Sequence, residues 1–292
     1  MKAGELNGTR IGIFGKGGAG KSTLTAMLAQ GLHARGHKVC VIDGDSTNFG
    51  LPHALGLEAP EQSLLEYYGG TVFSGGLVTC PVDDPRPLLD AALALKDLPG
   101  ECVARKDGRL VLLTAGKMGA LGPGAGCDGP VAKIARDFKL VNDNGEYLTL
   151  IDFKAGFEDS ARGALTRLDY VLVVIDPTTA SIEIAGDMLH MVQQIKAGAL
   201  PATAHLEDPE LVAVANTYYQ ESAIREVFFI LNQIQDPGTH KLLLEKLSQK
   251  GIRPIAAIPA DSAIRSAWLQ GGQVRIGNAE KELSKVIQVL EG

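Results

Sequence analysis

The sequence predicts an α/β fold, a mostly parallel, doubly wound sheet with helices on both faces. Short continuous apolar runs, which suit strands buried on both faces, alternate with segments of helical periodicity. The apolar runs lie at residues 10–14, 38–43, 110–113, 147–152, 170–176, 226–231 and 255–258. A glycine-rich turn joins the first run to a helical segment, and the 292 residues contain no repeat and no low-complexity linker. We therefore expect one domain, residues 1–292.

Helices are predicted between these strands. The first begins after the glycine-rich turn, where Leu24, Met27, Leu28 and Leu32 recur at helical spacing. Further helices are predicted near 63–68 and 88–95, then at 130–138, 160–167, 179–195 and 239–249, and two more close the chain. Residues 50–110 and 196–222 look irregular or inserted, the second with a weak helix signal.

Composition limits the classes of partner. The net charge is −6 and only 5% of residues are aromatic, which argues against a nucleic-acid partner. No apolar run is long enough to span a bilayer, so no membrane partner is expected. The cysteines, Cys40, Cys80, Cys102 and Cys127, form no C-x-x-C pair, and we expect reduced thiols in a cytoplasmic protein.

The glycine-rich turn fits the phosphate-binding loop pattern G-x-x-x-x-G-K-[ST]. It consists of Gly15, Lys16, Gly17, Gly18, Ala19, Gly20, Lys21, Ser22 and Thr23. Backbone N–H groups of such a loop cradle phosphates at a helix N-terminus. In this pattern Lys21 reaches the β- and γ-phosphates, and the Ser22 hydroxyl binds Mg²⁺. The alternative is a chance match, but the order strand, loop, helix favours a nucleoside triphosphate site.

Other chemical residues are expected at the carboxyl ends of the strands, where parallel sheets bind ligands. The candidates there are Asp43, Asp45, Cys127, Asp128, Asp152, Asp176, Asn232, Pro259 and Asp261. Any one acidic residue could simply cap the next segment. Several at one sheet edge beside a phosphate loop favour a functional site.

The motif G-K-G-G-x-G-K-S-T resembles the phosphate-binding loop of one ATPase family. This family contains the cell-division ATPase MinD, the partition ATPase ParA, the nitrogenase iron protein and the carbon monoxide dehydrogenase accessory ATPase CooC. This resemblance implies that the chain hydrolyses ATP and forms a homodimer in the ATP state. It also implies that Lys16 reaches across the dimer to the partner's nucleotide. Without the resemblance, Lys16 could be a solvated surface charge.

The resemblance extends to the segments around two strand ends. Asp152 and Gly156 match the segment in which the aspartate holds the water shell of Mg²⁺ and the glycine senses the γ-phosphate. Asp43-Gly44-Asp45 resembles the first switch, which implies that Asp45 orients or deprotonates the attacking water and that Asp43 supports Mg²⁺ or the geometry of the switch. Lys154 is unusual at its position, and the sequence assigns it no role.

The base side of the nucleotide is expected near the last strands. By resemblance, the Asn232 amide hydrogen-bonds adenine, and the segment from Pro259 to Asp261 borders the base. A guanine site would require N-K-x-D, whereas residues 232–235 read N-Q-I-Q. ATP is therefore favoured over GTP.

Residues 122–129, G-P-G-A-G-C-D-G, resemble the metal-binding segment of CooC and of the iron protein. Only Cys127 is present, because Gly129 replaces the second cysteine of a C-x-C pair and none occurs near residues 159–160. An iron–sulfur cluster is therefore disfavoured. Paired Cys127 thiolates at a dimer axis, supplemented by Asp128, would suit Zn²⁺ or Ni²⁺. The alternative is that Cys127 only packs at a helix start.

Taken with these observations, the resemblance to CooC implies a Mg-ATP-dependent dimeric switch ATPase that assists maturation or activation of a metalloenzyme. Two alternatives stay open. A ParA- or MinD-like positioning ATPase would need a basic surface or tail, and residues 277–292 carry three acidic residues against two lysines. A reductase like the nitrogenase iron protein would need a cluster.

Overall fold

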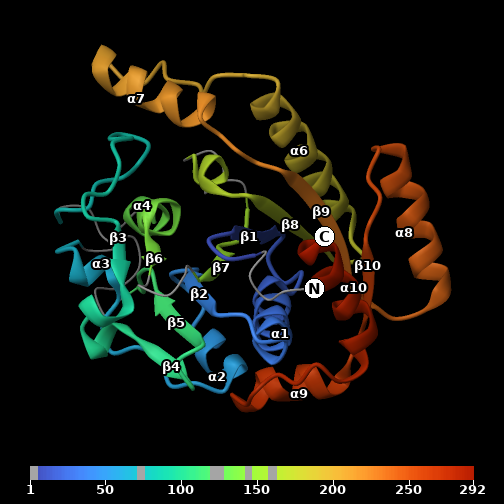
Figure 1. Cartoon of the computed structure of the whole chain (residues 1–292). Coiled ribbons are helices and arrows are strands. Elements are labelled where there is room, and N and C mark those ends of the chain that lie inside the picture. Colours follow the sequence, from blue (N-terminus) through green and yellow to red (C-terminus); the bar gives the residue numbers. More distant parts are fainter. Residues whose placement is uncertain (1–5, 71–75, 119–127, 142–146, 157–162) are drawn as a thin grey trace.

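A computed structural model of the chain describes residues 6–70, 76–118, 128–141, 147–156 and 163–292 (Figure 1). Within these residues, one sheet has the strand order β10-β9-β8-β1-β7-β2-β5-β4. Its strands are β1 (Arg10–Gly15), β2 (Val39–Gly44), β4 (Ala104–Lys106), β5 (Leu110–Thr114), β7 (Leu148–Phe153), β8 (Tyr170–Ile175), β9 (Glu226–Ile234) and β10 (Ala256–Pro259). All neighbouring strands run parallel apart from β4, which pairs antiparallel with β5. The predicted fold class is confirmed.

Along the chain, the helices occur between the strands and after the last strand. They are α1 (Lys21–Ala34), α2 (Leu51–Leu55), α3 (Leu64–Tyr67), α4 (Gly129–Asp137), α6 (Thr179–Lys196), α7 (Pro209–Gln220), α8 (Pro237–Gln249), α9 (Ser262–Gln270) and α10 (Glu280–Glu291). Short 3₁₀ turns are Leu95–Asp97, Gly100–Cys102, Ala164–Arg167 and Gly277–Ala279. In Figure 1, α7 lies at the periphery.

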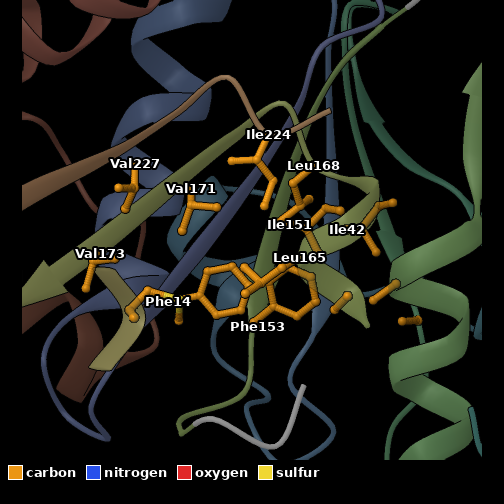
Figure 2. Packing of buried hydrophobic residues seen from close by; sticks show 14 of the residues in the cluster. Phe14, Ile42, Ile151, Phe153, Leu165, Leu168, Val171, Val173, Ile224 and Val227 are labelled. Atoms are coloured by element: carbon orange, nitrogen blue, oxygen red, sulfur yellow. The ribbon is translucent and has the colours of Figure 1, made fainter. Parts of the chain in front are cut away.

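Two hydrophobic cores, one on each face of the sheet, result from the alternation of side chains along the strands. On one face α1, α2 and α10 cover residues such as Ile11 and Ile13 of β1. On the other face α3, α4, α6 and α8 cover a second core, part of which Figure 2 shows. There the rings of Phe14 and Phe153 stack with centroids 4.5 Å apart. A sheet buried on both faces explains why its strands are continuously apolar.

The register of the central strands brings the predicted site residues together. Asp43 of β2 and Asp152 of β7 are direct neighbours in the parallel pairing, and Gly15 of β1 lies opposite Val174 of β8. All of these positions are at or near the carboxyl ends of their strands. The sheet therefore presents the phosphate loop and both aspartates at one edge.

Several predictions about local structure need correction. No helix forms over residues 88–95; instead β3 (Ala92–Ala94) pairs in parallel with β6 (Lys139–Val141) in a separate small sheet. This long-range pairing overrides the helix propensity of an alanine- and leucine-rich segment. The irregular region 50–110 also contains α2, α3 and β4, of which only α3 was predicted.

Three further segments had a predicted helix or a helix signal. Of the helix expected at 160–167, the structure describes residues 163–167, where Ala164–Arg167 is a 3₁₀ turn. The weak signal in residues 196–222 corresponds to α7, which begins after an Asp208 cap that accepts from the Glu210 N–H at 2.8 Å. The helix predicted at 130–138 is α4, with Pro130 in its first turn.

Candidate nucleotide site

A cavity of about 560 Å³ opens at the carboxyl edge of the sheet. It lies between the phosphate loop, the loop after β2, the end of β9 and the segment that follows β10. Many of its lining residues were predicted from the sequence: Gly17, Gly18, Gly20, Lys21, Ser22, Thr23, Asp45, Asn232, Pro259 and Asp261. Ala19, Asp43 and Asp152 are fully buried behind this lining. The structure therefore brings the phosphate, water-activating and base candidates to one cavity.

The phosphate loop has a backbone that only glycine adopts readily at some positions. Gly15 has φ +145°, and a Cβ there would lie 2.5 Å from the carbonyl oxygen of Val174. Gly20 has φ +98°, and a Cβ there would collide with the Asn232 amide. Helix α1 begins at the next residue, so its free N–H groups face the loop. This arrangement is an anion site made of backbone donors and a helix N-terminus.

The oxygen ligands expected for Mg²⁺ meet beneath the loop. The Ser22 hydroxyl donates to Oδ2 of Asp152 at 2.5 Å and accepts from Nδ2 of Asn48 at 2.7 Å. Burial raises the pKa of Asp152 to about 6, opposed by the Ser22 hydrogen bond and the Lys21 charge. A buried carboxylate beside a hydroxyl is a hard-oxygen donor set that suits Mg²⁺. Ser22 and Asp152, with Asp43 as neighbour, would hold that ion, which would neutralise phosphate charge.

Asp43 and Asp45 lie at the start of the loop that follows β2. Asp43 is fully buried, and burial raises its pKa to about 7 although Lys117 and a hydrogen bond oppose the shift. Lys117 contacts Oδ2 of Asp43 at 2.7 Å. Asp45 lines the cavity, and its Oδ1 accepts from the N–H and hydroxyl of Thr47 at 2.9 and 2.7 Å. Asp45, rather than Asp43, therefore faces the space where a nucleotide would bind.

The base end of the cavity differs from the expectation in one respect. Asn232 lies inside β9, which continues to Ile234, and its Nδ2 donates to the carbonyl of Ala19 at 2.8 Å. The amide thus holds the phosphate loop in addition to any contact with a base. Asp261 caps α9 by accepting from the N–H of Ala263 at 2.7 Å. Its carboxylate therefore also has a structural role.

Several lining residues were missed by sequence reasoning because no local motif marks them, and three of these contact the phosphate loop. Trp268 of α9 donates its Nε1–H to the Thr23 hydroxyl at 2.8 Å. Gln233 donates to the carbonyl of Gly18 at 2.8 Å. Asn48 reaches Ser22 as described above. Gln233 and Asn48 follow predicted site residues closely in sequence, which is the only signal that could have drawn attention to them.

Lys154, which had no assigned role, forms an ion pair with Asp128. The other oxygen of Asp128 accepts from the Ser46 hydroxyl at 2.7 Å. Asp128 is the residue before α4, and Lys154 also lines the nucleotide cavity. Cys127 and residues 122–126, the expected metal-binding segment, lie outside the described residues. The pair nevertheless connects the cavity to the residue that follows Cys127.

The three other cysteines lie in the part of the chain that the structure describes. Cys40 and Cys102 are buried free thiols, and Cys80 is half-buried. Burial raises the pKa of Cys40 to about 12, which makes that thiol unreactive. Among the residues that the structure describes, no group of three or more His, Cys, Asp or Glu side chains could hold a metal ion. No helix in the same set is both long and apolar enough to cross a membrane.

Comparison with known proteins agrees with this site. Residues 13–274 match the CobQ/CobB/MinD/ParA nucleotide binding domain family. The chain belongs to this family. The resemblance predicted from the phosphate loop is thereby confirmed, and residues 13–274 form a nucleotide-binding domain of the MinD/ParA type.

Two relatives span nearly the whole chain. An uncharacterized ATP-binding protein of Methanocaldococcus jannaschii is 29% identical over 284 residues, which are 96% of this chain and 99% of the relative. The carbon monoxide dehydrogenase accessory protein CooC of Rhodospirillum rubrum is 26% identical and covers 88% of this chain and 86% of its own length. Among solved structures, MinD in the MinC:MinD complex of Aquifex aeolicus has a TM-score of 0.60 at 20% identity and covers 97% of this chain and 95% of its own. That likeness concerns the fold.

Proposed function

We propose that this protein is a Mg-ATP-dependent ATPase that works as a homodimeric switch and assists maturation or activation of a metalloenzyme. Family membership and the cavity support the ATPase part. Similarity to an accessory protein of carbon monoxide dehydrogenase supports a metalloenzyme client. The delivered or sensed metal would be Zn²⁺ or Ni²⁺ rather than an iron–sulfur cluster.

The proposed reaction is transfer of the γ-phosphoryl group of ATP to water, giving ADP and phosphate. Lys21, buried at the start of α1, would bind the β- and γ-phosphates. Asp45, which faces the cavity, would orient the attacking water and accept its proton. Lys16 of the partner subunit would add positive charge as the transition state forms. No covalent intermediate is required, because positioning and charge neutralisation supply the catalysis.

The observation that supports a nucleotide-dependent switch is the ion pair between Lys154 and Asp128. Lys154 lies two residues beyond Asp152, in the segment expected to respond to the γ-phosphate. Asp128 directly follows Cys127 in the sequence. A shift of the Lys154 segment on hydrolysis would therefore act on the residue beside Cys127. This contact offers a physical route from nucleotide state to a metal or client at that position.

The ATPase part is tested with Lys21→Ala protein. We expect this variant to lose nucleotide binding or turnover, because the β- and γ-phosphates lose their buried cation. A matched control is Lys241→Ala on the surface of α8, where the side chain is 82% exposed. Equal Mg²⁺-dependent phosphate release from wild type and Lys21→Ala protein would overturn the site assignment.

The metalloenzyme part is tested by metal analysis of anaerobically purified protein, with and without ATP. We expect zinc or nickel in substoichiometric to one-per-dimer amounts, with occupancy that changes with ATP. Iron and acid-labile sulfide in a fixed ratio would instead favour the reductase alternative. Absence of bound metal in both states, with no uptake of added zinc or nickel, would contradict the metal-linked role.

A further inference from the structure

Lys117 occupies a position that the predicted mechanism does not use. It follows β5 and sends its side chain to the loop after β2, where its side chain is 19% exposed. Its Nζ donates to Oδ2 of Asp43 at 2.7 Å, to the carbonyl of Asp45 at 2.5 Å and to the carbonyl of Asn48. The ring of Phe49 lies 5.7 Å from the same ammonium. An ammonium has three donors, and these contacts engage all of them.

The three acceptors lie in one short segment, residues 43–48, and all of them contact the Nζ of Lys117. Two of them are backbone carbonyls, so the contacts restrain the path of the loop rather than a side chain alone. The backbone N–H of Met118 adds a hydrogen bond to the carbonyl of Ser46 at 3.0 Å. The segment that follows β5 therefore holds residues 45–48, through residues that do not line the nucleotide cavity.

The loop held in this way delivers two groups to the nucleotide site. Asp45 lines the cavity, and its carboxylate is oriented by Thr47. Asn48 donates its side-chain amide to the Ser22 hydroxyl at 2.7 Å, and Ser22 in turn contacts Asp152. Without Lys117, both groups would depend on a loop whose carbonyls have lost their shared donor. Catalytic groups displaced by about 1 Å can lose about a hundredfold in rate.

We infer that Lys117 is a positioning residue of the ATPase site, which acts by holding residues 45–48 so that Asp45 and Asn48 reach the nucleotide and Ser22. This inference rests on the proposed ATPase function. Lys117 is not part of the cavity lining, so its effect on turnover is indirect. It should influence the rate of hydrolysis much more than the affinity for ATP, because Lys21 and the loop N–H groups bind the phosphates without it.

The first test uses Lys117→Met, which keeps the length of the apolar stem and removes the donors. We expect kcat to fall about 10- to 100-fold while the KM for ATP changes less than about threefold. Lys241→Met is the matched control, since it makes the same substitution at an exposed position. Wild-type kcat in Lys117→Met protein would overturn the inference.

A second variant separates positioning from simple charge compensation of buried Asp43. Lys117→Arg keeps the positive charge, but a planar guanidinium cannot direct its donors to three acceptors gathered at one point. We expect Lys117→Arg to retain a near wild-type thermal midpoint and still lose at least about tenfold in kcat. If Lys117→Arg hydrolyses ATP at the wild-type rate, Lys117 serves only to balance charge.

A third readout does not depend on ATP hydrolysis. Trp268 is the only tryptophan of the chain, and a Cβ at Gly50 would lie 2.5 Å from its ring. The indole therefore packs against the end of the loop that Lys117 holds. Lys117→Met should increase acrylamide quenching of Trp268 emission about 1.5-fold or more in nucleotide-free protein. Unchanged quenching would count against the inference, whereas absence of wild-type ATPase activity would count against the proposed function only.

Discussion

Lys16 and Asp176 form an ion pair within one chain, with Nζ of Lys16 3.1 Å from Oδ2 of Asp176. Asp176 directly follows β8, so the pair lies at the sheet edge that carries the phosphate loop. The Lys16 side chain is 29% exposed and that of Asp176 is 10% exposed. The lysine expected to reach a partner's nucleotide therefore has an intramolecular partner that it must leave first.

Removal of Lys16 should separate ATP binding from turnover. Because its charge would act mainly in the transition state, Lys16→Ala should bind ATP yet lose about a hundredfold or more in kcat. It should also lose the ATP-dependent dimer. Sedimentation velocity with and without ATP measures the dimer fraction. The cross-dimer role is wrong if wild type and variant show the same dimer fraction in both conditions.

Removal of the competing partner should have the opposite effect on dimerisation. Asp176→Asn frees Lys16 from an ion pair worth about 1 kcal/mol, which corresponds to about a fivefold shift in an equilibrium constant. We expect the dimer to form at a correspondingly lower ATP concentration. A midpoint that stays the same or rises would show that Asp176 does not restrain Lys16.

Asp45 should matter for hydrolysis more than for binding. Its carboxylate faces the cavity, whereas Asp43 is buried behind it. Asp45→Asn should therefore bind ATP normally, hydrolyse it slowly and accumulate as the ATP-bound dimer. Single-turnover phosphate release and size-exclusion chromatography measure these two effects. Normal turnover in Asp45→Asn protein would mean that another residue orients the attacking water, and Asp43 would be the next candidate.

Cys127 should bind a transition metal together with its copy in the partner subunit. The expectation comes from the resemblance of residues 124–127 to a metal-binding segment. Isothermal titration of zinc and nickel into wild type and Cys127→Ser protein, with and without an ATP analogue, tests it. Cys80→Ser serves as the control, because it makes the same substitution at a half-buried cysteine. Equal affinity and stoichiometry in wild type and Cys127→Ser would leave Cys127 as a packing residue.

Asp84 should make the free energy of unfolding depend on pH in the acidic range. Burial alone raises its pKa, but hydrogen bonds from Arg86 and Thr79 and the charge of Lys133 outweigh burial and hold the pKa at about 2. Because this value lies below that of an unfolded aspartate, the stabilisation exists above about pH 4 and disappears as the pH falls toward 2.

The corresponding measurement compares wild type with Asp84→Asn. The variant should lose about 1 kcal/mol in free energy of unfolding at pH 6, and the difference should shrink between about pH 4 and 2. Urea unfolding at several pH values provides the data. Asp187→Asn, which removes an exposed carboxylate of α6, is the matched control substitution. A constant difference for Asp84→Asn would contradict the assignment of the low pKa.

Local sequence patterns were sufficient to predict much of the nucleotide site. The phosphate loop can be recognised from nine consecutive residues, because its function depends on closely spaced glycines, a lysine and a helix start. Asp43, Asp45 and Asp152 could be selected because parallel strands end at one edge. The order of apolar strands and helices likewise predicted the fold class without knowledge of any contact.

Contacts between distant segments were decided only by the tertiary structure. Lys117 reaches Asp43 across 74 positions, and Trp268 reaches Thr23 across 245. No spacing rule connects such residues, because the neighbouring strands and the returning C-terminal helices bring them together. The same reason explains the error over residues 88–95, where pairing with β6 outweighs local helix propensity. The sequence by itself thus determined the chemistry of the phosphate loop and the strand ends. The packing of the sheet decided which side chains hold those groups in place, since that depends on neighbours in space.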